Sequence, residues 1–303
     1  MKTKFIVNPA AGSGHCGREW RNLLAARLKL FPQHEISYTK APLEATLLAK
    51  EALQNGFKKI IAVGGDGTLN EIVNGFLDKD SKPLNPSACV GMLSLGTGKD
   101  FPRNLGYPES AAAILELLSH DKTRKIDVGK IEFQDGEKKT KYFINVASFG
   151  CSSEVVKKSL KMKKYFKKAA YLHTAGWVFL TAKPKTFRIK SENNQEREFL
   201  SYNIFVSNGF SSGGNMRWAP EAKIDDGLFD ITVLEKLPKW KLPLLVPKIF
   251  NGTLTKEKEV EVFRAKKIFV EASQTTEIEV DGELLGKLPA SFEVLPKAIN
   301  FLY

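Results

Sequence analysis

The sequence predicts a mixed fold, α/β plus all-β: an N-terminal doubly wound α/β domain, then a C-terminal antiparallel β-sandwich. Three observations predict it. Apolar strands alternate with helical patterns in the first half of the chain, and glycine-rich loops follow three of those strands. The second half instead contains a series of short strands with turn signals between them.

The first half has the periodicity of alternating strands and helices. A strand followed by a helix and a further strand is the pattern of a parallel sheet, because parallel neighbours need a long crossover connection. Strands are expected at residues 5–7, 35–39, 59–63 and 90–95, and helices at 18–30, 43–53 and 68–76.

The second half changes character near Asp127, and we place the domain boundary there: 1–127 form the α/β domain and 128–295 the sandwich. Short strands separated by turn residues are typical of antiparallel sandwiches. The expected strands are 126–133, 141–147, 187–190, 199–207, 229–234, 260–263, 268–272, 277–280 and 291–295.

The composition limits the classes of binding partner but does not identify one of them. The formal charge of +12 over 303 residues attracts anions: nucleic acid, nucleotide phosphates or an anionic membrane. Three scattered cysteines favour a reducing, cytoplasmic setting. No stretch has the composition of a signal peptide or a transmembrane helix, so we expect any membrane contact to be peripheral.

The loops at 8–17, 64–68 and 96–100 are the main candidates for phosphate binding. In a parallel sheet they lie at the carboxyl ends of strands, where glycine lets the backbone approach a phosphate and helix N-termini favour anions. Any one loop alone could be an ordinary turn. Gly12, Gly14 and Gly17 match a dinucleotide fingerprint, but the acidic residue expected after the second strand is missing. Gly98-Lys99 does not match the Walker A motif, because Asp100 follows where that motif has Ser or Thr.

Asp66 is the carboxylate within the second loop. Among phosphate-binding amides it would repel phosphate unless a cation such as Mg²⁺ intervenes. The alternative is that Asp66 caps the helix beginning at Thr68. Asn70 and Glu71 either line the same site or lie on the surface.

Taken together, the motifs resemble the diacylglycerol kinase catalytic family, which includes bacterial soluble lipid kinases and the sphingosine and ceramide kinases. The resemblance extends over nearly the whole chain. It rests on Asn8-Pro9…Gly12, Gly-Gly-Asp-Gly-Thr-Leu-Asn-Glu at 64–71, Gly96-Thr97-Gly98-x-Asp100-Phe101, Asn208-Gly209, Gly213-Gly214, Ala219-Pro220-Glu221-Ala222, Asp225-Asp226-Gly227-Leu228-Phe229-Asp230 and Val280-Asp281-Gly282-Glu283.

The resemblance implies an active site in the cleft between the two domains, with residues 296–303 returning to the first. It also implies ATP as co-substrate and a structural Mg²⁺ held by Lys223, Asp226 and Leu228. Only Asp226 offers a carboxylate there, and Lys223 and Leu228 would serve through carbonyl oxygens. The ATP contacts carried over are Asn8, Pro9, Ala10, Ala11, Gly12, Thr39, Gly65, Asp66, Gly67, Thr68, Leu69, Asn70, Glu71 and Thr97.

Glu283 matches the proton acceptor of the resembled family, and Asp66 and Asp281 are grouped with it as catalytic residues. Asp281-Gly282 between apolar flanks is a strong hairpin signal, which would place Glu283 at the start of a strand. Asp66 remains the alternative base. Lys99 and Ser13 depart from the family pattern and leave the phosphate contacts at both positions open.

A lysine-rich segment at 157–168 has most of its lysines on one helical face, which suits anionic headgroups. The alternative is a helix packed on the sandwich by its apolar face.

We therefore expect a kinase that transfers the γ-phosphoryl of ATP to a lipid hydroxyl, with diacylglycerol giving phosphatidic acid as the first choice. Its partner would be the lipid at an anionic membrane surface, and a homodimer is one alternative for its assembly. Other acceptors are a sphingoid base, monoacylglycerol or phosphatidylglycerol, and a soluble NAD-kinase-like enzyme is a further alternative. A nucleic-acid-binding module is not favoured, because no recognition-helix, zinc-knuckle or RNA-stacking signature is found. A nonenzymatic lipid binder is a third alternative, and it would require Glu283 and Asp66 to be dispensable.

Overall fold

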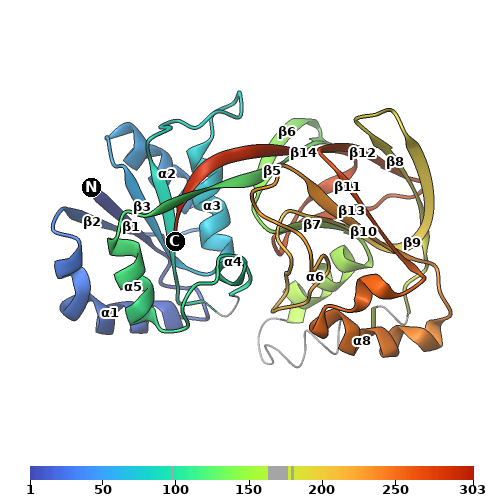
Figure 1. Cartoon of the computed structure of the whole chain (residues 1–303), viewed down its shortest axis with the longest axis horizontal. Helices are drawn as coiled ribbons and strands as arrows, with labels where there is room; N and C mark the ends of the chain where they lie inside the picture. Colours follow the sequence, from blue (N-terminus) through green and yellow to red (C-terminus); the bar gives the residue numbers. More distant parts are fainter. Residues whose placement is uncertain (97–98, 163–176, 179–180) are drawn as a thin grey trace. The chain divides into compact units, whose positions relative to one another are not determined.

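The computed structural model describes residues 1–96, 99–162, 177–178 and 181–303. The chain divides into two compact units, which are shown in Figure 1. The N-terminal unit comprises Met1–Val128, Ile224–Asp226 and Leu295–Tyr303. The C-terminal unit comprises Gly129–Lys223 and Gly227–Val294. The short segment Ile224–Asp226 was not expected in the first unit.

A parallel sheet forms the centre of the N-terminal unit, as the alternation predicts. The strand order is β2-β1-β3-β4, and the end of β14 adds a fifth parallel strand next to β4. β3 and β4 are buried along their whole length, which explains their unbroken apolar runs. The strands are β1 (Thr3–Val7), β2 (His34–Tyr38), β3 (Lys59–Gly64), β4 (Cys89–Ser94) and β14 (Glu283–Leu302).

Helices cover both faces of this sheet (Figure 1). Trp20 of α1 packs 5.3 Å from the ring of Phe5, in the cluster that also holds α5. On the other face, Gly75 lets α3 approach α2, because a Cβ there would lie 2.4 Å from the carbonyl oxygen of Thr46. The helices are α1 (His15–Arg27), α2 (Glu44–Gln54), α3 (Asp66–Phe76), α4 (Asp100–Asn104) and α5 (Ala111–Ser119), and the sequence had not predicted α4 or α5.

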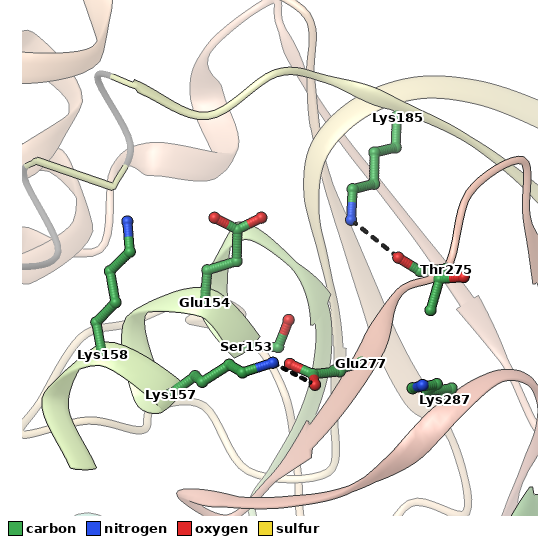
Figure 2. A pocket seen from close by; sticks show the side chains of 8 residues that line it. All are labelled: Ser153, Glu154, Lys157, Lys158, Lys185, Thr275, Glu277 and Lys287. Atoms are coloured by element: carbon green, nitrogen blue, oxygen red, sulfur yellow. Dashed lines mark hydrogen bonds and ion pairs between the residues drawn. The ribbon is translucent and has the colours of Figure 1, made fainter. Parts of the chain in front are cut away.

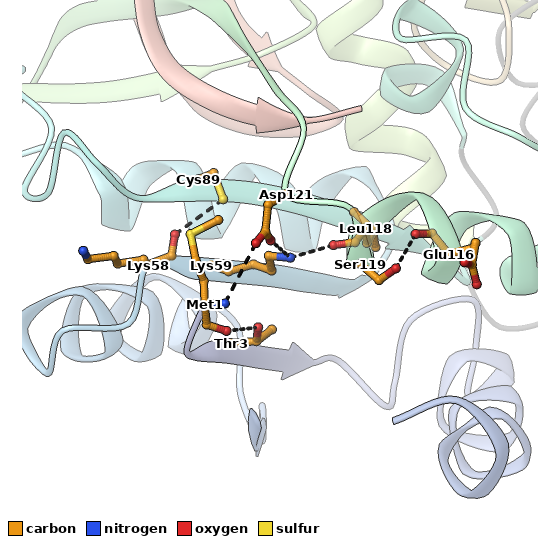
Figure 3. Close-up of polar contacts among 9 residues, drawn as sticks. All are labelled: Met1, Thr3, Lys58, Lys59, Cys89, Glu116, Leu118, Ser119 and Asp121. Atoms are coloured by element: carbon orange, nitrogen blue, oxygen red, sulfur yellow. Dashed lines mark hydrogen bonds and ion pairs between the residues drawn. The ribbon is translucent and has the colours of Figure 1, made fainter. Parts of the chain in front are cut away.

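Lys59 is a buried cation at the start of β3. Its side chain is 3% exposed, donates to the carbonyl of Leu118 at 2.8 Å and forms an ion pair with Asp121 (Figure 3). A buried ammonium is stable only when it is paired, because its desolvation is costly. The Asp121 carboxylate is half exposed, so solvent weakens its contribution.

Replacing Asp121 by Ala should lower the stability of the N-terminal unit. Lys59 would keep a single carbonyl partner, and we expect a loss of about 1–2 kcal/mol, less than for a fully buried pair. Thermal unfolding of the purified variant measures it. Asp135→Ala, which breaks the exposed Asp135–Lys139 pair, is the matched control and should leave the melting temperature nearly unchanged. Equal effects of both substitutions would contradict the role assigned to Asp121.

The C-terminal unit is built from antiparallel strands, as expected for the sandwich. Its strand pairing closes on itself in the order β7-β9-β8-β12-β14-β13-β7. Phe149 packs in its core against the rings of Phe187 and Phe292. The strands are β5 (Thr123–Asp135, which begins in the N-terminal unit), β6 (Glu137–Phe143), β7 (Val146–Gly150), β8 (Lys185–Ser191), β9 (Glu196–Ser207), β10 (Phe229–Glu235), β11 (Val260–Ala265), β12 (Lys267–Ala272) and β13 (Glu277–Val280).

Two features of this unit differ from the sequence prediction. The single strand expected at 141–147 is two strands, because the chain breaks at Ile144 and Asn145, whose N–H groups bond to a side chain. The helix α8 (Leu242–Asn251) was not predicted. The helix α6 spans Cys151–Met162, so the remainder of the lysine-rich segment lies outside the described residues.

Candidate active site

Three loops at the carboxyl ends of β1, β3 and β4 meet in the N-terminal unit. The carbonyl of Gly64 accepts hydrogen bonds from the N–H groups of Leu95 and Gly96, both at 2.9 Å. A Cβ on Gly96 would lie 2.7 Å from the Cα of Gly65, and a Cβ on Gly12 would lie 3.4 Å from the carbonyl of Leu95. Glycine is therefore required where the second and third loops touch.

The first loop is tied to the second by a side-chain pair. The Asn8 amide donates to the hydroxyl of Thr68 at 3.1 Å, and its carbonyl oxygen accepts from the N–H of Ala10 at 3.1 Å. Thr39 lies at the end of β2, where its N–H donates to the carbonyl of Val7 at 2.8 Å. Residues 8–12 and Thr39, all predicted ATP contacts, thus occupy the same edge of the sheet as the second loop.

Asp66 holds the third loop. Its two carboxylate oxygens accept hydrogen bonds from the N–H groups of Asp100 at 3.3 Å and Phe101 at 3.2 Å, the first residues of α4. The alternative that Asp66 caps a helix beginning at Thr68 is wrong, because α3 begins at Asp66 itself after Gly65. Asp66 caps a different helix, and the second and third loops are thereby fixed together.

The remaining predicted ATP contacts of α3 differ in accessibility. The Glu71 carboxylate accepts from the N–H of Ala45 at 3.1 Å, and its carbonyl accepts from the Thr46 hydroxyl at 2.8 Å, so Glu71 positions the start of α2. Leu69 is fully buried, and Asn70 bonds to Asn74 one turn later. Gly67 lies in the first turn of α3, close to the loops. Thr97 lies outside the described residues.

The hairpin predicted at Asp281-Gly282 is confirmed in the C-terminal unit. Both residues have a positive φ, and Val280 of β13 pairs with Glu283 of β14. The Asp281 carboxylate accepts hydrogen bonds from the N–H groups of three consecutive residues, 144–146, at 3.0–3.1 Å. Asp281 therefore holds the chain break between β6 and β7, whereas Glu283 is exposed at the start of β14.

Glu279 is a carboxylate that the sequence did not single out. One of its oxygens accepts from the N–H of Gly282 at 2.6 Å, and the other accepts from the Ser148 hydroxyl. Ser148 also contacts the hydroxyl of Ser152 at 2.8 Å. Burial raises the pKa of Glu279 to about 7, opposed by the Ser148 and Gly282 donors, and the nearby Asp281 raises it further.

The predicted metal ligands lie in a short turn before β10. Asp226 and Lys223 are exposed, and Leu228 is partly buried. The turn is anchored within the N-terminal unit, where Arg124 binds the Asp225 carboxylate at 2.6 Å and Asp127 donates its N–H to the carbonyl of Ile224 at 2.7 Å. Over the described ranges, no three His, Cys, Asp or Glu side chains gather as a metal site. A cation here would depend on carbonyl oxygens beside Asp226.

Comparisons with known proteins agree with this arrangement. Residues 2–131 match the diacylglycerol kinase catalytic domain, and residues 145–303 match the YegS C-terminal NAD kinase beta sandwich-like domain. Diacylglycerol kinases of Staphylococcus aureus strains bovine RF122 / ET3-1 and MRSA252 are 30% identical over 301 residues, covering 99% of this chain and 91% of theirs.

The chain belongs to the diacylglycerol kinase family. A solved structure of a provisionally assigned diacylglycerol kinase from Bacillus anthracis str. Sterne shares its fold, with a TM-score of 0.80 and 27% identity over 100% of this chain and 95% of that one. As a member of the diacylglycerol kinase family, the protein is a lipid kinase, and ATP is its co-substrate.

The raised pKa of Glu279 makes the stability of this lipid kinase depend on pH. The folded state binds the Glu279 proton more tightly than the unfolded state, whose carboxyl titrates near 4.5. The resulting stabilisation is complete below pH 4.5 and is lost as the pH rises through about 7. A rise in pKa from 4.5 to about 7 corresponds to about 3 kcal/mol.

Glu279→Gln should therefore raise the free energy of unfolding relative to the wild type more at pH 8 than at pH 5. The amide imitates the protonated carboxyl and does not titrate. Thermal unfolding of both proteins at the two pH values measures the difference. A stability difference that is the same at pH 5 and pH 8 would contradict a raised pKa.

Proposed function

We propose that this lipid kinase transfers the γ-phosphoryl group of ATP to the free hydroxyl of diacylglycerol and so forms phosphatidic acid. The observation that carries the proposal is the 30% identity to curated diacylglycerol kinases across 99% of the chain. A sphingoid base, monoacylglycerol and phosphatidylglycerol are the other acceptors to test. The soluble NAD-kinase-like alternative rests on the Gly-Gly-Asp-Gly loop at 64–67 and on a likeness of the C-terminal domain to that fold.

The linked loops of the N-terminal unit support the proposal that they bind the triphosphate of ATP. Glycines at 12, 65 and 96 leave the loop backbones without side chains, and α3 begins directly at the second loop. The first N–H groups of a helix favour a phosphate. In the proposed mechanism, Asp66 and Asn8 hold these loops in register while their backbone groups bind ATP.

Glu283 is the proposed proton acceptor. A lipid hydroxyl is a poor nucleophile at neutral pH and needs a base as the phosphoryl group is transferred. Glu283 is exposed, whereas the Asp281 carboxylate is engaged by three N–H groups. Asp281 is accordingly proposed to position the hairpin that carries Glu283.

Mg²⁺ is proposed in two places. One ion would accompany the ATP phosphates and neutralise charge during transfer. The other would be held by Asp226 together with the carbonyl oxygens of Lys223 and Leu228, where it would stabilise the turn.

Access to the lipid is proposed to be peripheral, from the cytoplasm. In the part of the chain that the structure describes, no helix is both long and apolar enough to cross a bilayer. The lysine-rich segment begins on α6 with Lys157 and Lys158, which are both exposed, whereas the side chain of Lys161 and the residues Lys163, Lys164, Lys167 and Lys168 lie outside what the structure describes. A lysine-rich helical face attracts anionic headgroups.

A panel of lipids in mixed micelles tests which hydroxyl is phosphorylated. With ATP and Mg²⁺ held constant, we expect kcat/KM to be highest for diacylglycerol. A higher kcat/KM for a sphingoid base, monoacylglycerol or phosphatidylglycerol would show that this lipid, and not diacylglycerol, is the substrate. The assignment as a lipid kinase would still hold.

A further inference from the structure

A second candidate site lies in the C-terminal unit, apart from every residue assigned to ATP, the metal or the base. It is a pocket of about 540 Å³, formed by α6, the start of β8, the loop before β13, and β13 and β14. Figure 2 shows the side chains that line it: Ser153, Glu154, Lys157, Lys158, Lys185, Thr275, Glu277 and Lys287.

The charges around the pocket are unbalanced, with four lysines against two glutamates. Lys157 and Glu277 neutralise each other at 2.8 Å. Lys185 donates to neutral groups, the Thr276 hydroxyl at 3.3 Å and the Thr275 carbonyl at 3.4 Å. Among the described residues, neither Lys158 nor Lys287 forms an ion pair. Three ammonium groups thus surround the pocket with no carboxylate at ion-pair distance, although Asp135 attracts Lys287 from further away, and together they favour an anion.

Glu154 adds a negative charge to the lining of the pocket. Figure 2 shows its carboxylate rising from α6 beside the pocket, and it forms no ion pair with a described residue. An ionised carboxylate only accepts hydrogen bonds, so its complement in a ligand is a donor such as a hydroxyl. The neighbouring Ser153 hydroxyl already donates to the carbonyl of Gly150 at 2.8 Å and can offer a ligand only its lone pairs.

We propose that this pocket binds a phosphate ester that carries a free hydroxyl, with the phosphate against Lys158, Lys185 and Lys287 and the hydroxyl donated to Glu154. Lysine ammonium groups bind phosphate as point charges. A free polyol phosphate and the phosphoglycerol headgroup of a lipid share this chemistry. The inference does not depend on which lipid the kinase phosphorylates.

Calorimetric titration of the full chain with glycerol 1-phosphate and with inorganic phosphate tests the proposal. We expect glycerol 1-phosphate to bind about tenfold more tightly, the value of one added hydrogen bond to a charged group. Glu154→Gln should abolish most of that preference. The double variant Lys158→Gln and Lys287→Gln should weaken both ligands at least tenfold. The absence of saturable binding, or equal affinities for the two ligands, would overturn the proposal.

The matched control is Lys190→Gln with Lys266→Gln, two exposed lysines of the same unit outside the pocket. This pair removes the same charge and should leave both affinities unchanged. An equal loss in both double variants would reduce the effect to general surface charge and contradict a site. Thermal unfolding checks that each variant is folded.

Vesicles distinguish the two sources of the ligand. Retention on phosphatidylglycerol vesicles that is released by glycerol 1-phosphate and lost in the Lys158/Lys287 variant would assign the pocket to a headgroup. If glycerol 1-phosphate binds the protein but does not release it from the vesicles, the pocket is assigned to a free phosphate ester.

Discussion

Replacing Glu283 by Gln should lower kcat by about 10²–10⁴-fold, the usual contribution of a general base. Gln keeps the size and hydrogen-bonding capacity of the side chain and removes its basicity. Because Glu283 is exposed and begins β14 after a two-residue turn, the substitution should leave the hairpin and the melting temperature intact. The dissociation constant of ATP, measured by calorimetry, should also be unchanged.

Glu293→Gln is the matched control for this prediction. Glu293 lies on the same strand and pairs with Lys267 at 3.0 Å, away from the hairpin. It should retain nearly the wild-type kcat. If Glu283→Gln also retains it, the proton acceptor is another group, and Asp66 becomes the first candidate.

Asp66→Asn should reduce kcat/KM by about 10²-fold or more. The amide presents one oxygen in place of two, so that a donor N–H₂ group faces the N–H of Asp100 or Phe101. Loss of a helix cap costs about 0.5–2 kcal/mol, and small displacements of substrate-positioning groups can cost 10²-fold in rate. We expect a raised KM for ATP and a modest decrease in melting temperature.

Glu192→Gln separates the loss of stability from the loss of activity. Like Asp66, the Glu192 carboxylate accepts a backbone N–H at each of its two oxygens, from Lys266 at 3.1 Å and from Lys267 at 3.2 Å, but outside the glycine loops. It should destabilise without a comparable loss of rate. Recovery of Asp66→Asn activity by excess Mg²⁺ would show that the Asp66 carboxylate acts on the metal, contrary to a role in fixing the loops.

Local sequence patterns predicted a structural element correctly where the same pattern of apolar or turn residues extended over the whole segment. The buried strands β3 and β4 have continuous apolar runs, and the Asp281-Gly282 turn has the residues that two positive φ angles require. The helix α5 was missed although Ser110 caps it and its segment is rich in alanine and leucine, both of which are local helix signals. The break at Ile144 and Asn145 depends on Asp281, more than 130 residues away, and no local pattern contains it.

The partners of the candidate site residues could be predicted less well than their positions. Asp66 was correctly singled out as a carboxylate among backbone N–H donors, but its partners belong to α4, 34 and 35 residues later. Glu279 alternates with the core residues Ile278 and Val280, which predicts a solvent-facing side chain. Ser148 and Ser152, which approach that face from β7 and the start of α6, bury its carboxylate instead.

The most direct measurement of the central assignment is the transfer of label from ATP to an extractable lipid. With Mg²⁺ and diacylglycerol in mixed micelles, ATP labelled at the γ-phosphate should give a labelled lipid phosphomonoester, and ATP labelled at the α-phosphate should give none. The γ-label should fall to background when the lipid is omitted. If the γ-label remains in the aqueous phase with diacylglycerol and with every other lipid of the panel, the protein is not the lipid kinase that its fold and its relatives indicate.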